Sequence, residues 1–192
     1  MQRRTLLLAP LPMALAACSG GGDRATGAST TSTTPGSGGL AGLGLADAPA
    51  QTVIEKLDAL DQARPLDFKA SVTATELVVT DSAGEHRMEL PADRFYLSIA
   101  PYVTTTHECF NHSLSGCQGE QVATTVRLKA VSDSGAVLLD EDRTTGRNGF
   151  VGIWLPSGET GKLTVTLDER SGSVPFATGS DDPTCLTTLK LA

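Results

Sequence analysis

The sequence predicts an α+β protein that is mainly β, in which a small N-terminal helix and hairpin region precedes an antiparallel β-sandwich. Two observations support this fold class. Hydrophobic residues recur every three to four positions before Pro65 and every second position after it. The alternating segments after Pro65 are short and are separated by turns that contain glycine, which is typical of antiparallel sandwiches.

The first residues of the chain indicate export. Residues 1–17 read as a signal peptide, with a basic start at Arg3 and Arg4 and an apolar run over residues 6–17 that is too short to cross a bilayer. The run ends in small residues before Cys18, which resembles a bacterial lipobox. We therefore expect a lipid on Cys18 and an extracytoplasmic location, in the periplasm or on the outer face of the cell envelope.

The rest of the chain is expected to form a tether and two folded parts. Residues 18–39 comprise the lipidated cysteine and a flexible linker rich in Gly, Ser and Thr. Residues 40–90 are expected to form a small N-terminal domain, and residues 91–192 a β-sandwich that carries the metal site.

One helix is expected in the N-terminal domain. Asp47 is a plausible N-cap, and Val53, Ile54, Leu57 and Leu60 recur at helical spacing before Pro65 ends the pattern. After this helix, the expected strands cover residues 77–80 and 86–90 as a hairpin, then 95–100, 122–130, 137–139, 150–155, 163–167, 174–176 and 185–191.

Two features of the later strands concern the sandwich. Alternation along the last strand places Cys185 on the same inward face as Leu189 and Leu191. The stretch 122–167 resembles a prealbumin-like or carboxypeptidase-regulatory-type β-sandwich, a likeness of fold that implies no function.

Composition excludes several classes of function. The chain has 15 Lys and Arg against 22 Asp and Glu, and its net charge of −7 argues against a nucleic-acid binder, which needs a basic face. Only 4 % of its residues are aromatic, and its four cysteines are too few for a disulfide-dense miniprotein.

Cysteine and histidine concentrate in one segment. His107, Cys109, His112 and Cys117 lie between two strand patterns, in a loop or a short helical turn, and Cys185 starts the last strand. Three thiols and two imidazoles make a soft set of ligands, which favours Cu(I), with zinc as the competitor, over calcium or magnesium. The paired C-x2-C spacing of zinc sites is absent.

Two other functions remain open from the residues alone. Two of the cysteines of an exported protein often form a structural disulfide, which would leave a binding module without metal. A thiol–disulfide oxidoreductase is the other alternative, although C-x-x-C spacing is lacking. Because the sequence carries no motif of a serine hydrolase, nucleotide-binding enzyme or zinc protease, we expect a binding protein rather than an enzyme. Thiol-dependent reduction of Cu(II) is the one reaction that this expectation leaves open.

Four segments resemble the CueP family of periplasmic copper-resistance and copper-binding proteins. They are residues 93–103 (DRFYLSIAPYV), 107–120 (HECFNHSLSGCQGE), 148–156 (NGFVGIWLP) and 181–189 (DDPTCLTTL), and the likeness spans roughly residues 45–192. The three cysteines of the family fall on Cys109, Cys117 and Cys185. The resemblance implies copper tolerance, thiol-dependent reduction of Cu(II), copper supply to a Cu,Zn superoxide dismutase, and a homodimer formed through the N-terminal domain.

The expected mechanism follows from these residues. Cys109, Cys117 and Cys185 would reduce Cu(II) and hold Cu(I), since a pair of thiols can give up two electrons and close as a disulfide. His107 and His112 would serve as secondary ligands or as bases that help to form the thiolates. The lipobox and the long tether are a departure from the family pattern. A protein anchored in this way would not diffuse freely to a client protein.

Overall fold

The computed structural model describes residues 39–192. The expected signal peptide, Cys18 and the linker up to residue 38 lie outside the described residues. Within residues 39–192, no helix is long and apolar enough to cross a membrane.

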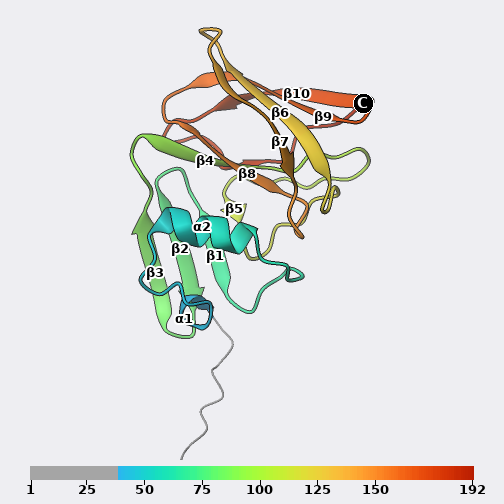
Figure 1. The fold of residues 1–192 in the computed structure, drawn as a ribbon. Coiled ribbons are helices and arrows are strands. Elements are labelled where there is room, and N and C mark those ends of the chain that lie inside the picture. Colours follow the sequence, from blue (N-terminus) through green and yellow to red (C-terminus); the bar gives the residue numbers. More distant parts are fainter. Residues whose placement is uncertain (1–38) are drawn as a thin grey trace, which may run out of the picture. The chain divides into compact units, whose positions relative to one another are not determined.

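The strands of the described chain form three sheets (Figure 1). The first has the order β3-β2-β1-β5, from strands Gly84–Glu89, Glu76–Asp81, Lys69–Val72 and His112–Ser113. The second has the order β10-β9-β6-β7, from Arg170–Ala177, Thr160–Leu167, Thr125–Ser132 and Val137–Thr144. The third has the order β11-β4-β8, from Cys185–Leu186, Arg94–Ile99 and Val151–Pro156. The predicted class, α+β and mainly β, is confirmed.

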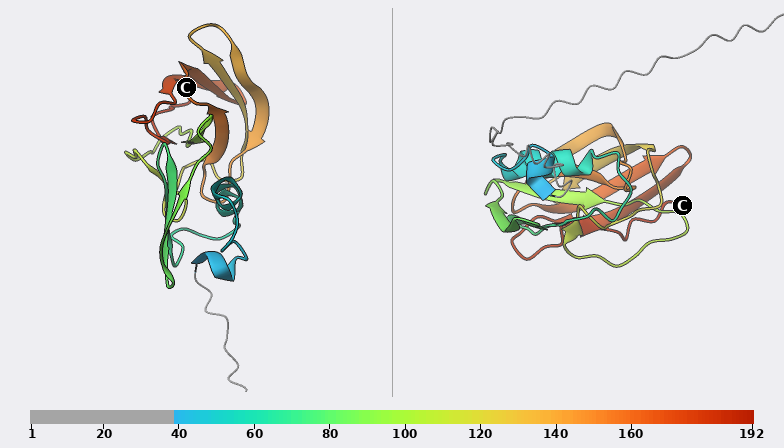
Figure 2. Two further views of the ribbon diagram at one scale, coloured as in Figure 1. Left: turned by 90° about the vertical axis from the view of Figure 1, so that its left-hand side faces the viewer. Right: turned by 90° about the horizontal axis from the view of Figure 1, so that it is seen from below.

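A single amphipathic helix covers the first sheet. Helix α2 (Ala50–Asp58) follows the one-turn helix α1 (Gly39–Gly42) and lies against one face of β1–β3 (Figure 2). Its residues Val53, Ile54 and Leu57 are fully buried in a core that also contains the inward residues of β1 and β2. Their helical spacing is what buries them together.

The predicted start of this helix is wrong. Pro49, not Asp47, is the N-cap residue, with an extended backbone (φ −65°, ψ 152°). Proline favours this position because its fixed φ suits a helix start and it has no N–H group to leave unpaired. Leu60 lies beyond the end of the helix at Asp58.

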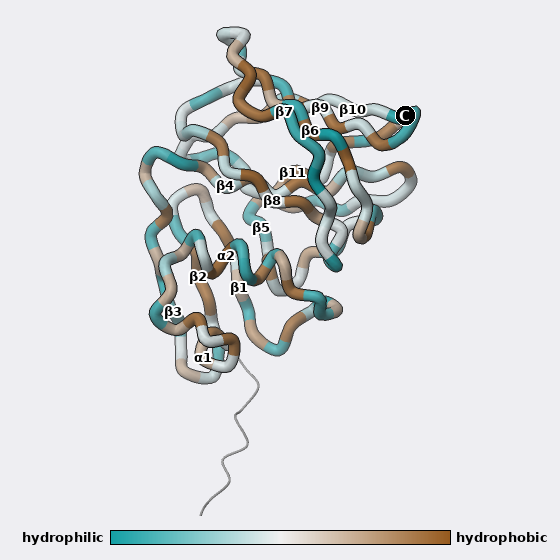
Figure 3. Tube along the Cα trace, viewed as in Figure 1, coloured by the Kyte–Doolittle hydropathy of each residue, from teal (hydrophilic) through white to brown (hydrophobic). Residues whose placement is uncertain are grey.

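The second and third sheets face each other across the sandwich core. The core gathers alternate residues of four strands: Phe95, Leu97, Ile99, Val126, Leu128, Ala130, Ile153, Leu155, Leu163 and Val165. Figure 3 shows the hydrophobic residues concentrated on β4 and β8, whereas the outer strand β7 is hydrophilic over its second half, from Asp140 to Thr144. The predicted strand over residues 122–130 begins only at Thr125, because Ala123 takes a left-handed backbone (φ 50°) that interrupts extended structure and leaves Val122 exposed.

Strand β4 is buried on both faces. Phe95, Leu97 and Ile99 point into the sandwich core. The alternate residues are buried as well: Tyr96 packs in the core beneath α2, and Ser98 is fully buried. Strand β4 therefore separates the two cores.

The last strand differs from the prediction. Strand β11 contains only Cys185 and Leu186 and pairs with β4 in parallel, with Cys185 opposite Ser98. Because the strand ends at Leu186, the period-two pattern does not continue, and Cys185 packs in a different cluster from Leu189 and Leu191. The expectation that these three side chains share one face is therefore wrong, although all three are buried.

The buried Arg64 guanidinium links α2 to the segment that follows β5. It donates hydrogen bonds to the carbonyl oxygens of Leu57 (2.8 Å), Gln62 (2.7 Å) and Leu114 (2.8 Å). Replacing it with the similarly sized Met leaves these acceptors unpaired, so we expect Arg64→Met to lower the free energy of unfolding by about 3 kcal/mol in urea denaturation. The exposed Arg147→Met is the control, and an equal loss in both variants would contradict this role.

Candidate metal centre

The first part of the site is built where the loop after β4 joins the first sheet. Residues His112 and Ser113 form β5, which pairs with β1 so that His112 lies opposite Val72. The His112 backbone N–H donates to Thr184 Oγ1 (3.0 Å), and that hydroxyl donates to the Val72 carbonyl (2.6 Å). These bonds fix a histidine that is fully buried.

The same loop is tied to the last strand. The Phe110 carbonyl accepts the backbone N–H groups of Thr184 (3.0 Å) and Cys185 (3.1 Å). Phe110 follows Cys109 directly, so these bonds bring the first cysteine of the loop beside β11. Residues far apart in the sequence thus meet at one end of the sandwich.

The five predicted ligand residues come together, in two overlapping groups. We call His107, Cys109 and Cys117 the outer triad, and His112, Cys117 and Cys185 the inner triad. Within each triad, the potential ligand atoms lie within 4.8 Å of one another, and Cys117 belongs to both. The Cys109 and Cys117 sulfurs are 3.6 Å apart, and the Cys185 sulfur is 3.6 Å from His112 Nδ1. Cys109, Cys117 and Cys185 are all free thiols.

The two triads differ in burial. All three residues of the inner triad are buried, with exposed fractions of 0 % for His112, 3 % for Cys185 and 9 % for Cys117. In the outer triad, His107 is exposed and Cys109 is half-buried. These two residues also line a surface pocket of about 510 Å³. Solvent therefore reaches the site from the outer triad.

The three thiols influence one another's protonation. The hydrogen bond with Cys117 raises the pKa of Cys109 to about 11. The neighbouring Cys109 and Cys117 thiols, and then burial, raise the pKa of Cys185 far above its ordinary value. Hydrogen bonding from Cys109 and Cys185 lowers the pKa of Cys117, with a further contribution from His112. The metal-free cluster therefore favours one thiolate, on the cysteine that the two triads share.

A carboxylate behind the inner triad was missed by the sequence analysis. Asp58, the last residue of α2, places Oδ1 3.9 Å from His112 Nε2, and both atoms are buried without a hydrogen-bond partner. Tyr96 on β4 donates a hydrogen bond to the other oxygen of Asp58. Burial raises the pKa of Asp58, against the opposing effects of His112 and Tyr96. Nothing in the spacing of Asp58 and His112 along the chain indicates this contact.

A second carboxylate holds the loop of the outer triad. Oε2 of Glu120 accepts the backbone N–H groups of Val103 (2.9 Å), Thr104 (2.9 Å) and Thr105 (3.0 Å). These bonds lower the pKa of Glu120 below its ordinary value. The segment that leads to His107 is thus fastened by the Glu120 carboxylate and by the Thr106 hydroxyl, which donates to the Thr187 carbonyl (2.6 Å).

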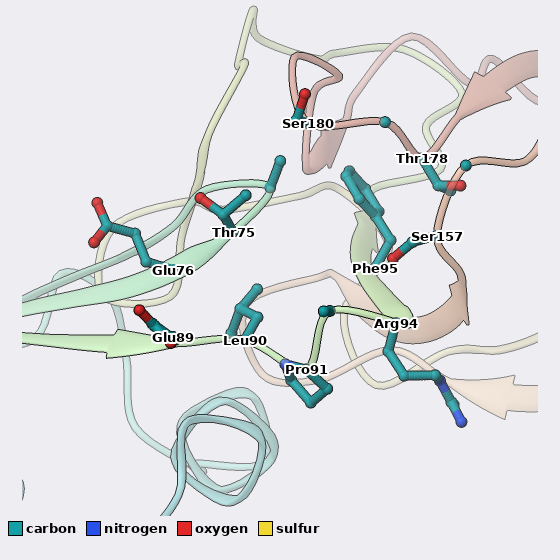
Figure 4. A pocket seen from close by; sticks show the side chains of 14 residues that line it. Thr75, Glu76, Glu89, Leu90, Pro91, Arg94, Phe95, Ser157, Thr178 and Ser180 are labelled. Carbon is teal, nitrogen blue, oxygen red and sulfur yellow. The ribbon is translucent and has the colours of Figure 1, made fainter.

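Another surface pocket, of about 530 Å³, is lined by no cysteine or histidine. It lies between the β2–β3 hairpin and the β8–β9 turn, with Thr75 and Leu90 on the first side and Phe95 and Thr178 on the second (Figure 4). None of the five predicted site residues lines it.

The cluster of sulfur and imidazole groups on a β-sheet scaffold places this chain in the class of proteins whose site can hold a soft metal ion. The chain belongs to the CueP family of periplasmic copper-binding proteins, whose model matches residues 52–190. It is also similar to a crystal structure titled "Crystal Structure of S.CueP", with 42 % sequence identity and a TM-score of 0.76 over 80 % of this chain and 94 % of that one. No curated protein matches the chain. The periplasmic description of the family indicates an extracytoplasmic location.

The Glu120 contacts predict a local effect of one substitution. Glu120→Gln replaces a charged acceptor with a weaker one, so we expect faster hydrogen exchange at the amides of Val103, Thr104 and Thr105 near neutral pH. Since the pKa of Glu120 is lowered in the folded protein, the protection is present above the unfolded pKa and is lost as the pH falls through the folded pKa.

The control is Glu108→Gln, which changes an exposed carboxylate of the same loop. Equal exchange rates in Glu120→Gln and in the unsubstituted protein, measured by mass spectrometry, would show that Glu120 does not fasten the loop.

Proposed function

We propose that this protein binds copper outside the cytoplasm, holding Cu(I) on Cys109, Cys117 and Cys185 with the help of His107 and His112. One observation carries the proposal: the sulfur of Cys185, from the last strand, lies beside the loop that contains the other four residues. Thiolate and imidazole ligands suit Cu(I), with zinc as the competing metal.

The proposal includes reduction of Cu(II) by the thiols. Cys109 and Cys117, whose sulfurs are 3.6 Å apart, would close as a disulfide and release two electrons and two protons. Each Cu(II) takes up one electron, so one disulfide accompanies two Cu(I) ions. Cys185 and His112 remain to hold Cu(I) after the disulfide has formed.

The same contact between Cys109 and Cys117 favours a second candidate, a thiol–disulfide oxidoreductase. In that case the pair would exchange electrons with a protein disulfide, and the histidines would have no ligand role. A third candidate is a binding module with one structural disulfide, which would resist a mild reductant.

The wider role that we propose is copper tolerance, with transfer of copper to a client such as a Cu,Zn superoxide dismutase. A lipid on Cys18 would hold the protein at the membrane, and the N-terminal domain would form a homodimer. The tether restricts which clients the site can reach, so an anchored carrier would serve partners close to the membrane surface.

A competition titration tests copper binding. Under anaerobic conditions, we expect the reduced protein to withdraw Cu(I) from a coloured chelator. Cys117→Ser removes a sulfur from both triads and should lower the apparent Cu(I) affinity by about a hundredfold or more. His86→Ala, which changes the one histidine away from the site, should match the unsubstituted protein. Equal copper retention by Cys117→Ser would reject the proposal, and tighter retention of Zn(II) than of Cu(I) would assign the other metal.

Counting electrons tests the reduction. Adding Cu(II) to the reduced protein without oxygen should yield two Cu(I) ions for each Cys109–Cys117 disulfide, detected by peptide mapping and by the loss of two hydrogens in mass. Cys185→Ser should still form this disulfide, whereas Cys109→Ser should not. Cu(I) production without loss of thiols would contradict the mechanism, and turnover of a protein disulfide without copper would favour the oxidoreductase.

A further inference from the structure

We propose that the two triads are successive copper sites: the outer triad receives and releases the ion, the inner triad stores it, and Cys117 remains bound throughout the exchange. This inference rests on the proposed copper binding and assigns different roles to ligands that the sequence presents as one set.

The first support is that the five ligand atoms divide into two groups. Each triad offers two sulfurs and one imidazole nitrogen, all within 4.8 Å of one another. The two groups share one atom, the Cys117 sulfur. An ion can therefore have the same donor set in either position, and the shared sulfur can hold it while the other two ligands change.

The second support is the difference in burial and anchoring. His112 is fixed by a strand pairing with β1 and by the Thr184 hydroxyl, and Cys185 is fixed by the parallel pairing with β4. His107, in contrast, is exposed on a loop outside the named strands, which only the side chains of Glu120 and Thr106 hold near it. A preordered site loses less conformational entropy when it binds an ion, so the inner triad is expected to bind more tightly.

The third support is the packing between the two imidazoles. The buried ring of Phe150 lies beside both, with centroid distances of 4.7 Å to His112 and 6.0 Å to His107. Because His107 and Cys109 line the surface pocket, copper that arrives there meets the outer triad first. Transfer through Cys117 then joins the two positions without a ligand-free step.

The exchange balances in bonds and protons. When the ion moves inward, its bonds to His107 and Cys109 break, bonds to His112 and Cys185 form, and the bond to Cys117 persists. Cys185 loses its thiol proton and Cys109 regains one, so no net proton or electron is needed. The reverse order releases copper toward the surface pocket.

Nuclear magnetic resonance of the imidazole rings can distinguish the two positions, because Cu(I) has a filled d shell and is diamagnetic. The chain has three histidines, and His86 serves as an internal control. All samples carry Cys18→Ser, so that only the site thiols count. In the reduced protein, the first equivalent of Cu(I) should shift the ring nitrogen signals of His112. In Cys185→Ala, it should shift those of His107 instead.

Rates of release provide the second readout. His107→Ala should slow the transfer of Cu(I) to a chelator by about tenfold. Its loss of equilibrium affinity should be much smaller than that of Cys185→Ala. Glu108→Gln, an exposed neighbour on the same loop, is the matched control. Because His107 is exposed, its substitution leaves the buried cores intact.

The outcomes separate the hypotheses. If all five residues formed a single ligand shell, the first equivalent of Cu(I) would shift the signals of both imidazoles together. His107→Ala and Cys185→Ala would then lose the same Cu(I) affinity, and neither would slow the release of Cu(I). These results would overturn the proposal. Storage on His107 in the unsubstituted protein would also overturn it. If the reduced protein takes no Cu(I) from the chelator, the proposed copper binding itself is wrong.

Discussion

The parallel pairing of β11 with β4 is the constraint on which the candidate metal centre depends. The backbone N–H groups of Ser98 and Ala100 donate to the carbonyls of Thr184 and Leu186, each at 2.9 Å. If β11 moved away, these two donors would lose their backbone acceptors, which costs free energy. The end of the chain is therefore held beside β4, and the position of the Cys185 sulfur follows from backbone bonds rather than from its own side chain.

Burial of the thiols explains why the cluster suits a soft cation. Cys117 and Cys185 pack with Ala100 and Phe150, with Cys109 against their edge. In such surroundings a second thiolate would lie close to the first without water to screen the two charges. A bound cation offsets the repulsion between the two thiolates, and sulfur binds Cu(I) in preference to hard ions such as calcium. The mutual pKa effects of the cysteines and their choice of metal thus have one cause, their proximity in a poorly solvated place.

The sequence predicts local structure and the five residues of the metal site, but it does not predict that these residues form two triads. Period-two patterns predict strands such as β6 and β9, because burial of alternate residues is a local property of the chain. The start of α2 and the break at Ala123 were missed because they depend on the backbone conformation of single residues. His107 and His112 look equivalent in the sequence. Only the pairing of β5 with β1 buries one and leaves the other exposed, and no spacing rule encodes a pairing between distant segments.

The contacts of β4 also connect the centre to the N-terminal part of the chain. Tyr96 packs beneath α2 and bonds Asp58, whose other oxygen faces His112. Arg64, just after the helix, bonds the carbonyl of Leu114, two residues beyond that histidine. A sequence boundary at residue 90 separates these groups along the chain but not in space, and the independence of the two predicted domains stays a prediction. Asp58, from the predicted N-terminal domain, lies behind His112, so a displacement of α2 would change the surroundings of His112 before those of Cys109, the half-buried cysteine.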